Sequence, residues 1–183
     1  CELAGIKPIS GCSLNLIFDG DEDSHELLCL AKTNNGHKNL MKIISSAHNN
    51  YSYSSPIIQF KDLTELNDDI VVISGGKNSH IFEYLRRNNI SDAENKIDQF
   101  TKYFKDDFVL EIQKTNREDE LEFIKNILPL SIKKGIPIVA TNDVLFSTQN
   151  DYEIHETKVC INTGRTLNLS LIHISEPTRP DYI

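Results

Sequence analysis

Short apolar runs alternate along this chain with segments whose apolar residues have helical spacing. The clearest runs are Ile70–Ile73 and Ile136–Ala140, with a further strand expected at Phe108–Ile112, and the intervals between these three segments are long enough for one or two helices each. Uninterrupted apolar strands indicate burial on both faces, and helices between strands indicate parallel pairing through right-handed crossovers. The pattern therefore predicts an α/β fold, either a layered sheet or a barrel.

Helix signals fill the intervals between these runs. We expect helices near 36–49, 79–87, 92–104, 117–134 and 152–161, with a short helical turn at 62–66. Asn116 can cap the helix at 117–134, and Gly135 followed by Pro137 ends it. Pro129 lies inside that helix and predicts a kink or a break into two pieces.

The first thirty residues have a strand pattern of their own. Extended runs near 6–18 and 27–31 flank the acidic segment Asp19–Asp23, which predicts a hairpin-like pair of strands. The acidic segment has the oxygen ligands that Ca²⁺ prefers, but it lacks the spacing of an EF-hand loop. We therefore interpret it as a solvated turn.

Charge and hydropathy restrict the partners of the chain. Among its 183 residues, 27 are acidic and 19 are basic, which gives a formal net charge of -8. A negative net charge argues against a free-standing protein that binds nucleic acid, because such proteins neutralise phosphates with basic side chains and release counterions. No apolar run approaches the roughly 20 residues of a membrane helix. The four cysteines have no CxxC spacing. Together these features predict a cytoplasmic protein with reduced thiols and no membrane contact.

Candidate chemistry lies where the predicted strands end, because ligands of parallel α/β folds bind at the carboxyl ends of strands. Three such ends carry polar or glycine residues: Ser74-Gly75-Gly76, Gln113–Thr115 and Asn142-Asp143. Gly75-Gly76 could bind a phosphate through backbone N–H groups, but without the P-loop lysine it favours a plain tight turn. Asp143 could be a metal ligand or a base, but Asn-Asp after a strand is also typical of turn and capping chemistry, which the sequence alone favours.

The histidines form no sequence motif. His25, His37, His48, His80 and His155 are scattered, with no HxH or HxxxH pair, so each by itself favours a surface or hydrogen-bonded histidine over a metal ligand. No GxSxG elbow or zinc-type cysteine spacing is present either.

Several segments, taken in order, resemble the PHP (polymerase and histidinol phosphatase) domain of bacterial DNA polymerase III alpha subunits. The resemblance covers about residues 1–168. Its motifs are Ala4-Gly5-Ile6-Lys7-Pro8-Ile9-x-Gly11, Leu30-Ala31 with Gly36 and Asn39-Leu40, Ile73-Ser74-Gly75-Gly76, Tyr103-Phe104 to Leu110-Glu111, Gly135 to Val144, Asp151 with His155-Glu156, and Thr163-Gly164 with Thr166-Leu167.

The resemblance implies a partial distorted βα barrel, TIM-like, with mostly parallel strands. The family's opening segment with its paired histidines would precede Cys1, so the barrel would lack the first strands. We expect residues 1–168 to be a PHP domain fragment and 169–183 to be a non-native read-through tail, because 170–180 resembles translated sequencing adapter.

In family members with a working site, His, Asp, Glu and Cys ligands at the strand ends hold a metal cluster for phosphoesterase or 3′–5′ exonuclease chemistry. In this sequence only His25 and Asp143 match ligand positions. Ser13 replaces an acidic ligand, Gly76 stands where a cysteine is frequent, and Leu145 replaces a histidine. Because a catalytic metal needs about three protein ligands, the resemblance implies a vestigial site without a metal cofactor.

The function implied is that of a non-catalytic scaffold within a replicative polymerase. The parent would be a DNA-directed DNA polymerase that uses Mg²⁺ on another domain, and the fragment alone would be inactive. Its partners would be the remainder of the alpha subunit and the proofreading exonuclease subunit, with DNA reached only through the parent. Two alternatives stay open: an active metal-dependent PHP phosphoesterase or 3′–5′ exonuclease, and a non-catalytic α/β binding module that uses the Gly75-Gly76 turn.

Overall fold

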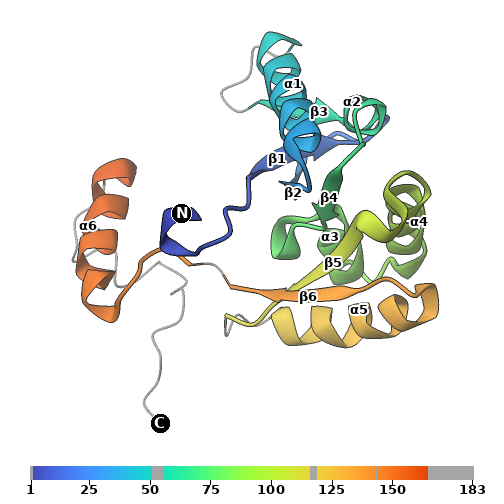
Figure 1. Cartoon of the computed structure of the whole chain (residues 1–183). Coiled ribbons are helices and arrows are strands. Elements are labelled where there is room, and N and C mark those ends of the chain that lie inside the picture. Colours follow the sequence, from blue (N-terminus) through green and yellow to red (C-terminus); the bar gives the residue numbers. More distant parts are fainter. Residues whose placement is uncertain (1, 51–55, 116–118, 143, 165–183) are drawn as a thin grey trace.

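Six strands form one open sheet in the computed structural model, which describes residues 2–50, 56–115, 119–142 and 144–164 (Figure 1). The sheet order is β3-β1-β2-β4-β5-β6. The strands are β1 (Gly11–Ile17), β2 (His25–Ala31), β3 (Ile57–Gln59), β4 (Ile70–Ile73), β5 (Phe108–Gln113) and β6 (Ile138–Thr141).

Strand pairing is mixed. β1 pairs antiparallel with β2, and β2 pairs antiparallel with β4. The pairs β1–β3, β4–β5 and β5–β6 are parallel. The antiparallel register from Gly11↔Leu30 to Leu16↔His25 confirms the predicted hairpin. The mixed, unclosed sheet confirms the α/β class and is consistent with a partial βα barrel.

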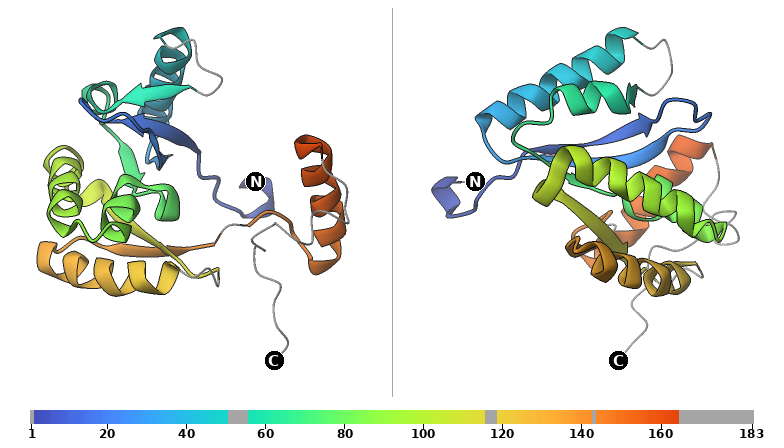
Figure 2. Two further views of the ribbon diagram at one scale, coloured as in Figure 1. Left: turned by 180° about the vertical axis from the view of Figure 1, so that it is seen from behind. Right: turned by 90° about the vertical axis from the view of Figure 1, so that its right-hand side faces the viewer.

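Six helices within the described ranges follow or join the strands. They are α1 (Asn34–Asn50), α2 (Phe60–Glu65), α3 (His80–Arg86), α4 (Ile90–Phe104), α5 (Glu120–Lys134) and α6 (Tyr152–Thr163). Short 3-10 segments are η1 (Glu2–Ala4), η2 (Gly76–Asn78), η3 (Lys105–Asp107) and η4 (Gln149–Asp151). α1 to α5 lie along the sheet, whereas α6 stands apart from it in the views of Figures 1 and 2.

The core lies between the sheet and the helices α1 to α5. In β1 and β2, alternate residues face this core, so that Leu14 and Leu16 of β1 and Leu27 and Cys29 of β2 are buried. The residues between them face the other side of the sheet. This period of two decides which strand residues can meet in a site.

Several local predictions differ from the structure. α5 begins at Glu120 after the N-cap Asp119, later than the expected start near 117, and Asn116 lies outside the described residues. α5 also continues through Pro129 instead of breaking there. Pro129 is on the exposed side, where the carbonyl freed at Lys125 can bond to water. The three-residue strand β3 was not predicted.

Burial on both faces is confirmed for some of the apolar runs only. β4 and β5 have buried residues on both faces, β4 as its uninterrupted apolar sequence predicts and β5 with the acidic Glu111 among its buried residues. β6 does not, because it pairs with β5 alone and exposes Ala140. The prediction was wrong for β6 because composition does not tell whether a strand lies at an edge.

Candidate functional site

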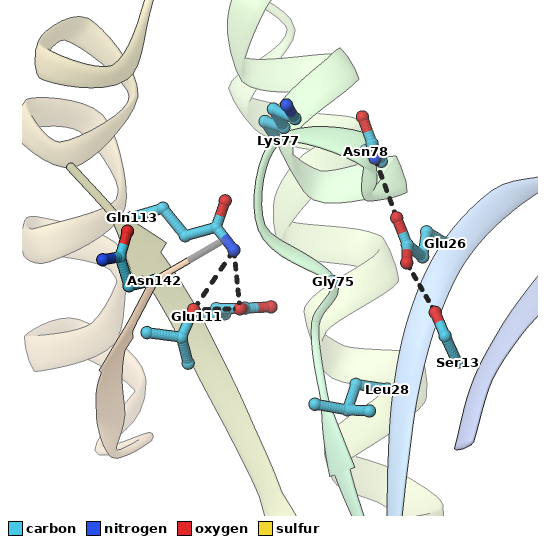
Figure 3. Close-up of a pocket in the computed structure, with 10 residues that line it drawn as sticks. Ser13, Glu26, Leu28, Gly75, Lys77, Asn78, Glu111, Gln113 and Asn142 are labelled. Carbon is cyan, nitrogen blue, oxygen red and sulfur yellow. Dashed lines mark hydrogen bonds between the residues drawn. The ribbon is translucent and has the colours of Figure 1, made fainter. Parts of the chain in front are cut away.

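Three of the predicted strand ends meet in one cavity. The cavity has a volume of about 270 Å³ and is lined by Gly75 after β4, Gln113 at the end of β5 and Asn142 after β6. Because β2 runs antiparallel to β4, the first residues of β2 reach the same edge. Figure 3 shows the lining side chains in two groups on either side of Gly75. The remaining lining residues are Ser13, Glu26, Leu28, Lys77, Asn78, Glu111 and Thr141.

One group is centred on the carboxylate of Glu26. The Ser13 hydroxyl donates to Glu26 Oε1 at 2.5 Å, and the Asn78 amide donates to Glu26 Oε2 at 2.8 Å (Figure 3). Both oxygens of Glu26 are therefore bonded to uncharged donors, one from β1 and one from η2. The carboxylate links two strands to the segment that follows β4.

The second group is centred on the buried carboxylate of Glu111, which is 5% exposed. Its Oε1 accepts hydrogen bonds from the Thr141 hydroxyl of β6 and, at 3.1 Å, from the Gln113 amide. The Gln113 amide also donates to Thr141 Oγ1 at 3.2 Å. The Glu111 backbone N–H donates to the buried Ser74 hydroxyl at 2.9 Å. Glu111 therefore joins the ends of β5 and β6 as Glu26 joins those of β1 and β2.

Replacement of Thr141 by valine tests this link. Valine keeps the shape of threonine but removes the hydroxyl that donates to the buried Glu111 carboxylate. We expect a loss of about 1 to 2 kcal/mol in the free energy of unfolding, measured by urea denaturation. Thr157→Val is the control, because the Thr157 hydroxyl donates only to a backbone carbonyl on exposed α6. A Thr141→Val effect no larger than that of the control would contradict a stabilising role for Glu111.

The sequence-predicted ligand positions are distributed as follows. Ser13 lies in the cavity beside Glu26. Gly76 begins η2 next to the cavity and contributes no side-chain donor. Leu145 lies in the segment after β6 and is 46% exposed. Asp143 is outside the described residues.

His25 points to the opposite face of the sheet. Neighbouring residues of a strand face opposite sides, so Glu26 faces the cavity while His25 packs against His80, with ring centroids 4.2 Å apart. The sequence suggested scattered histidines, but the fold brings these two together. The assignment of His25 and Asp143 as vestigial ligands stays a prediction.

His80 is the most perturbed of the described histidines. It is 4% exposed, and its Nε2 has no hydrogen-bond partner among the described residues. Nε2 lies 3.6 Å from Asp21 Oδ2, and the same oxygen accepts from the buried Lys96 ammonium at 2.8 Å. Burial, then the neighbouring His25 and Lys96, lower the pKa of His80 from 6.5 to about 3. Asp21 is thus fixed to the core, so the acidic segment is not simply the solvated turn expected.

The cavity side chains that the structure describes do not fit a catalytic metal. Across the described ranges, no three His, Cys, Asp or Glu side chains are grouped closely enough to bind an ion. The two carboxylates that are present bind hydroxyl and amide donors instead. Metal-activated hydrolysis requires about three protein ligands and an open position for water.

Glu26 and Glu111 were not identified from the sequence, although signals for both exist. Glu111 is an acid inside an apolar strand, which is unusual unless the acid is partnered. Glu26 is separated by one residue from Leu28, and Leu28 pairs in register with Ser13. Combining the strand period of two with a hairpin register would have placed Glu26 beside Ser13.

Comparison with known proteins is consistent with this architecture. The PHP domain family matches residues 1–115. DNA polymerase III subunit alpha of Escherichia coli K12 is 37% identical over 180 residues, and that of Pasteurella multocida Pm70 is 34% identical over 179 residues; both alignments cover 97% of this chain. The corresponding protein of Buchnera aphidicola from Acyrthosiphon pisum is 35% identical over 92% of the chain. The chain spans about 15% of the length of each of these relatives.

No helix within the described ranges is long and apolar enough to cross a membrane. The family match extends over more than half of the chain and includes the hairpin that carries Ser13 and Glu26, together with β4 and β5. The chain therefore belongs to the PHP domain family.

Proposed function

We propose that this chain is part of the PHP region of a bacterial DNA polymerase III alpha subunit, and that its strand-end cavity supports structure instead of hydrolysing phosphodiesters. The observation that carries the proposal is the bonding of the two cavity carboxylates. Glu26 and Glu111 accept hydrogen bonds from Ser13, Asn78, Gln113 and Thr141, all of which are uncharged.

Three positions where the family pattern has metal ligands carry other residues in this chain, and their chemistry supports an inactive cavity. A serine hydroxyl is a poor replacement for a carboxylate ligand, and glycine and leucine have no donor atoms at all. Ser13, Gly76 and Leu145 occupy three such positions in the family pattern. Hydrogen bonds now join the strand ends that a metal cluster would otherwise join, so the cavity keeps its shape without an ion.

The whole protein would carry out template-directed DNA synthesis, with Mg²⁺ bound by carboxylates on a domain outside these 183 residues. The relatives named above, all alpha subunits of DNA polymerase III, support this assignment. The remainder of the alpha subunit and the proofreading exonuclease subunit would be the partners of the PHP region. DNA would be contacted through the parent protein, in the cytoplasm. The net charge of -8 agrees with indirect contact to DNA.

The test uses the gene extended past both ends of this chain. We expect a single reading frame that encodes a polymerase several times longer than 183 residues. The purified long protein should contain no stoichiometric Zn²⁺ or Mn²⁺ by elemental analysis and should not hydrolyse a phosphodiester with those ions added. Polymerase activity in the same preparation is the control for a folded protein.

Two outcomes would contradict the proposal. A gene that encodes only this short product would remove the polymerase assignment. Stoichiometric metal binding together with hydrolysis that Asp143→Ala abolishes would show an active phosphoesterase site instead of a vestigial one.

A further inference from the structure

α5 has apolar side chains on two opposite faces. On the inner face, Phe123, Ile127 and Leu130 are buried, and the helix packs on β5 and α3. On the other face, Leu121, Leu128 and Ile132 are 55%, 41% and 82% exposed. A surface helix is normally polar on its outer side, and a helix that is apolar all round is typical of a buried one.

The three exposed residues lie along one side of the helix. Spacings of seven and four residues place them within a narrow arc of the helix surface. We call Leu121, Leu128 and Ile132 the outer stripe of α5. Lys125 lies in the same arc and is exposed. Within the described part of the chain, Lys125 makes no ion pair.

The neighbouring elements leave the outer stripe uncovered. At the carboxyl end of α5, Lys133 binds Glu94 at 2.6 Å and Lys134 binds Asp98 at 2.5 Å, and both acids belong to α4. These contacts attach α5 sideways to α4. Figure 1 shows α5 along the outer border of the molecule, beyond β6. Among the residues that the structure describes, α5 is therefore held in place by its inner face and one flank.

We propose that the outer stripe of α5 is a docking surface for another part of the same polypeptide, outside residues 1–183. This inference depends on the proposed function, because it requires a longer parent. The chain spans about 15% of the length of its relatives, so most of such a polypeptide lies outside the structure. Domains joined in one chain bury apolar patches against one another, whereas an apolar patch exposed to water favours aggregation.

The composition of the stripe defines the complementary surface. Two leucines and an isoleucine require apolar side chains opposite them. Lys125, within the same arc, requires an acidic side chain or backbone carbonyls at the middle of the contact. The occupant is therefore an apolar patch with a carboxylate or backbone carbonyls near its centre, on a folded domain of the parent.

Thiol labelling of the long protein tests this surface. Ile132→Cys places a thiol at the most exposed position of the stripe, and Lys61→Cys on exposed α2 is the matched control. Both variants are treated with iodoacetamide, and labelling is measured peptide by peptide so that the native cysteines do not interfere. We expect Cys at 132 to react at least about tenfold more slowly than Cys at 61, as for a protected site. Leu121→Cys, at the other end of the stripe, should give the same protection.

Equal labelling at 132, 121 and 61 in the long protein would overturn the docking surface and leave the polymerase assignment intact. Failure to find any longer reading frame would instead refute the proposed function itself. Labelling of the 183-residue chain distinguishes a second copy as the occupant. Protection at 132 that appears only with concentration-dependent dimerisation of this short chain would also overturn an intramolecular partner.

Discussion

Replacement of Gly75 by alanine should destabilise the protein by at least about 3 kcal/mol, because two costs coincide at this position. Gly75 has a φ of +87°, a conformation that alanine adopts only with strain. A Cβ at Gly75 would also lie 2.1 Å from the Glu26 carbonyl oxygen and 2.8 Å from the Glu26 carbonyl carbon. Both atoms belong to the backbone of β2 and cannot move aside without disturbing the sheet.

Gly135→Ala separates the two costs. Gly135 has a φ of +67° at the end of α5, and an added Cβ there would meet no atom within 4 Å. This control should lose only the conformational term, about 1 kcal/mol. Urea unfolding followed by circular dichroism measures both variants. If Gly75→Ala costs no more than Gly135→Ala, then the close approach of Gly75 to β2 is incorrect.

The position of Gly75 also connects this prediction to the cavity. Asn78 lies three residues after Gly75, and its amide donates to Glu26 Oε2. If a side chain at position 75 displaced the first residues of β2, Glu26 would move away from Asn78. The sequence favoured a plain tight turn at Gly75. Glycine is required there both because φ is positive and because the backbone of β2 leaves no room for a Cβ atom. Phosphate binding is not needed to explain the glycine.

Acidification should lower the free energy of unfolding over an unusually wide pH range, because His80 has a low pKa in the folded protein. Its pKa in the folded protein is about 3, whereas an exposed histidine has a pKa of 6.5. Between pH 6.5 and 3 the unfolded chain binds a proton at this residue and the folded chain does not. Stability is therefore fully present above pH 6.5 and falls as the pH decreases, with a slope approaching about 1.4 kcal/mol per pH unit from this group.

The surroundings of His80 explain why its neutral form is retained. The ring is buried between Phe18 and His25, and the Lys96 ammonium lies nearby. The Asp21 carboxylate could favour a protonated ring, but its Oδ2 is already paired with Lys96. The remaining ionisable side chains that line the adjacent cavity of about 230 Å³ are Glu22, Asp23, Glu83, Tyr84 and Arg87.

Urea midpoints at pH 7, 6, 5 and 4 measure the effect. His80→Phe keeps an aromatic ring at the buried position and removes the titrating group, so the variant should lose less stability than the wild type between pH 6.5 and 4. His37→Gln on the exposed side of α1 is the control and should leave the wild-type slope in place. Parallel pH profiles for His80→Phe and the wild type would rule out His80 as the source.

Much of the fold follows from local patterns. The apolar runs of β4 and β5 are strong strand signals, and the caps Ser79 and Asn89 are helix-start residues whose side chains accept N–H bonds in the structure. The hairpin of β1 and β2 follows from two strands around an acidic turn. These elements depend on residues near one another in sequence, so the sequence determines them almost alone.

The candidate site could be predicted from the sequence only in part. The strand ends after β4, β5 and β6 were identified correctly, because parallel topology brings carboxyl ends to one edge. Glu26 and Glu111 were missed because a carboxylate becomes a site residue only through its partners. Those partners come from other elements of the fold: Ser13 from β1, Asn78 from η2 and Thr141 from β6.

The sequence by itself determined the α/β class, most helices and strands, and membership of the PHP family, because these depend on periodicity and on collinear motifs. Tertiary structure decided which side of the hairpin borders the cavity, so that Glu26 faces it while His25 faces away, since one residue of strand register reverses the side to which every side chain points. It also decided that His80 would be buried beside Lys96 with a low pKa. Burial and the distances between charges are properties of the packed chain, and no local pattern carries them.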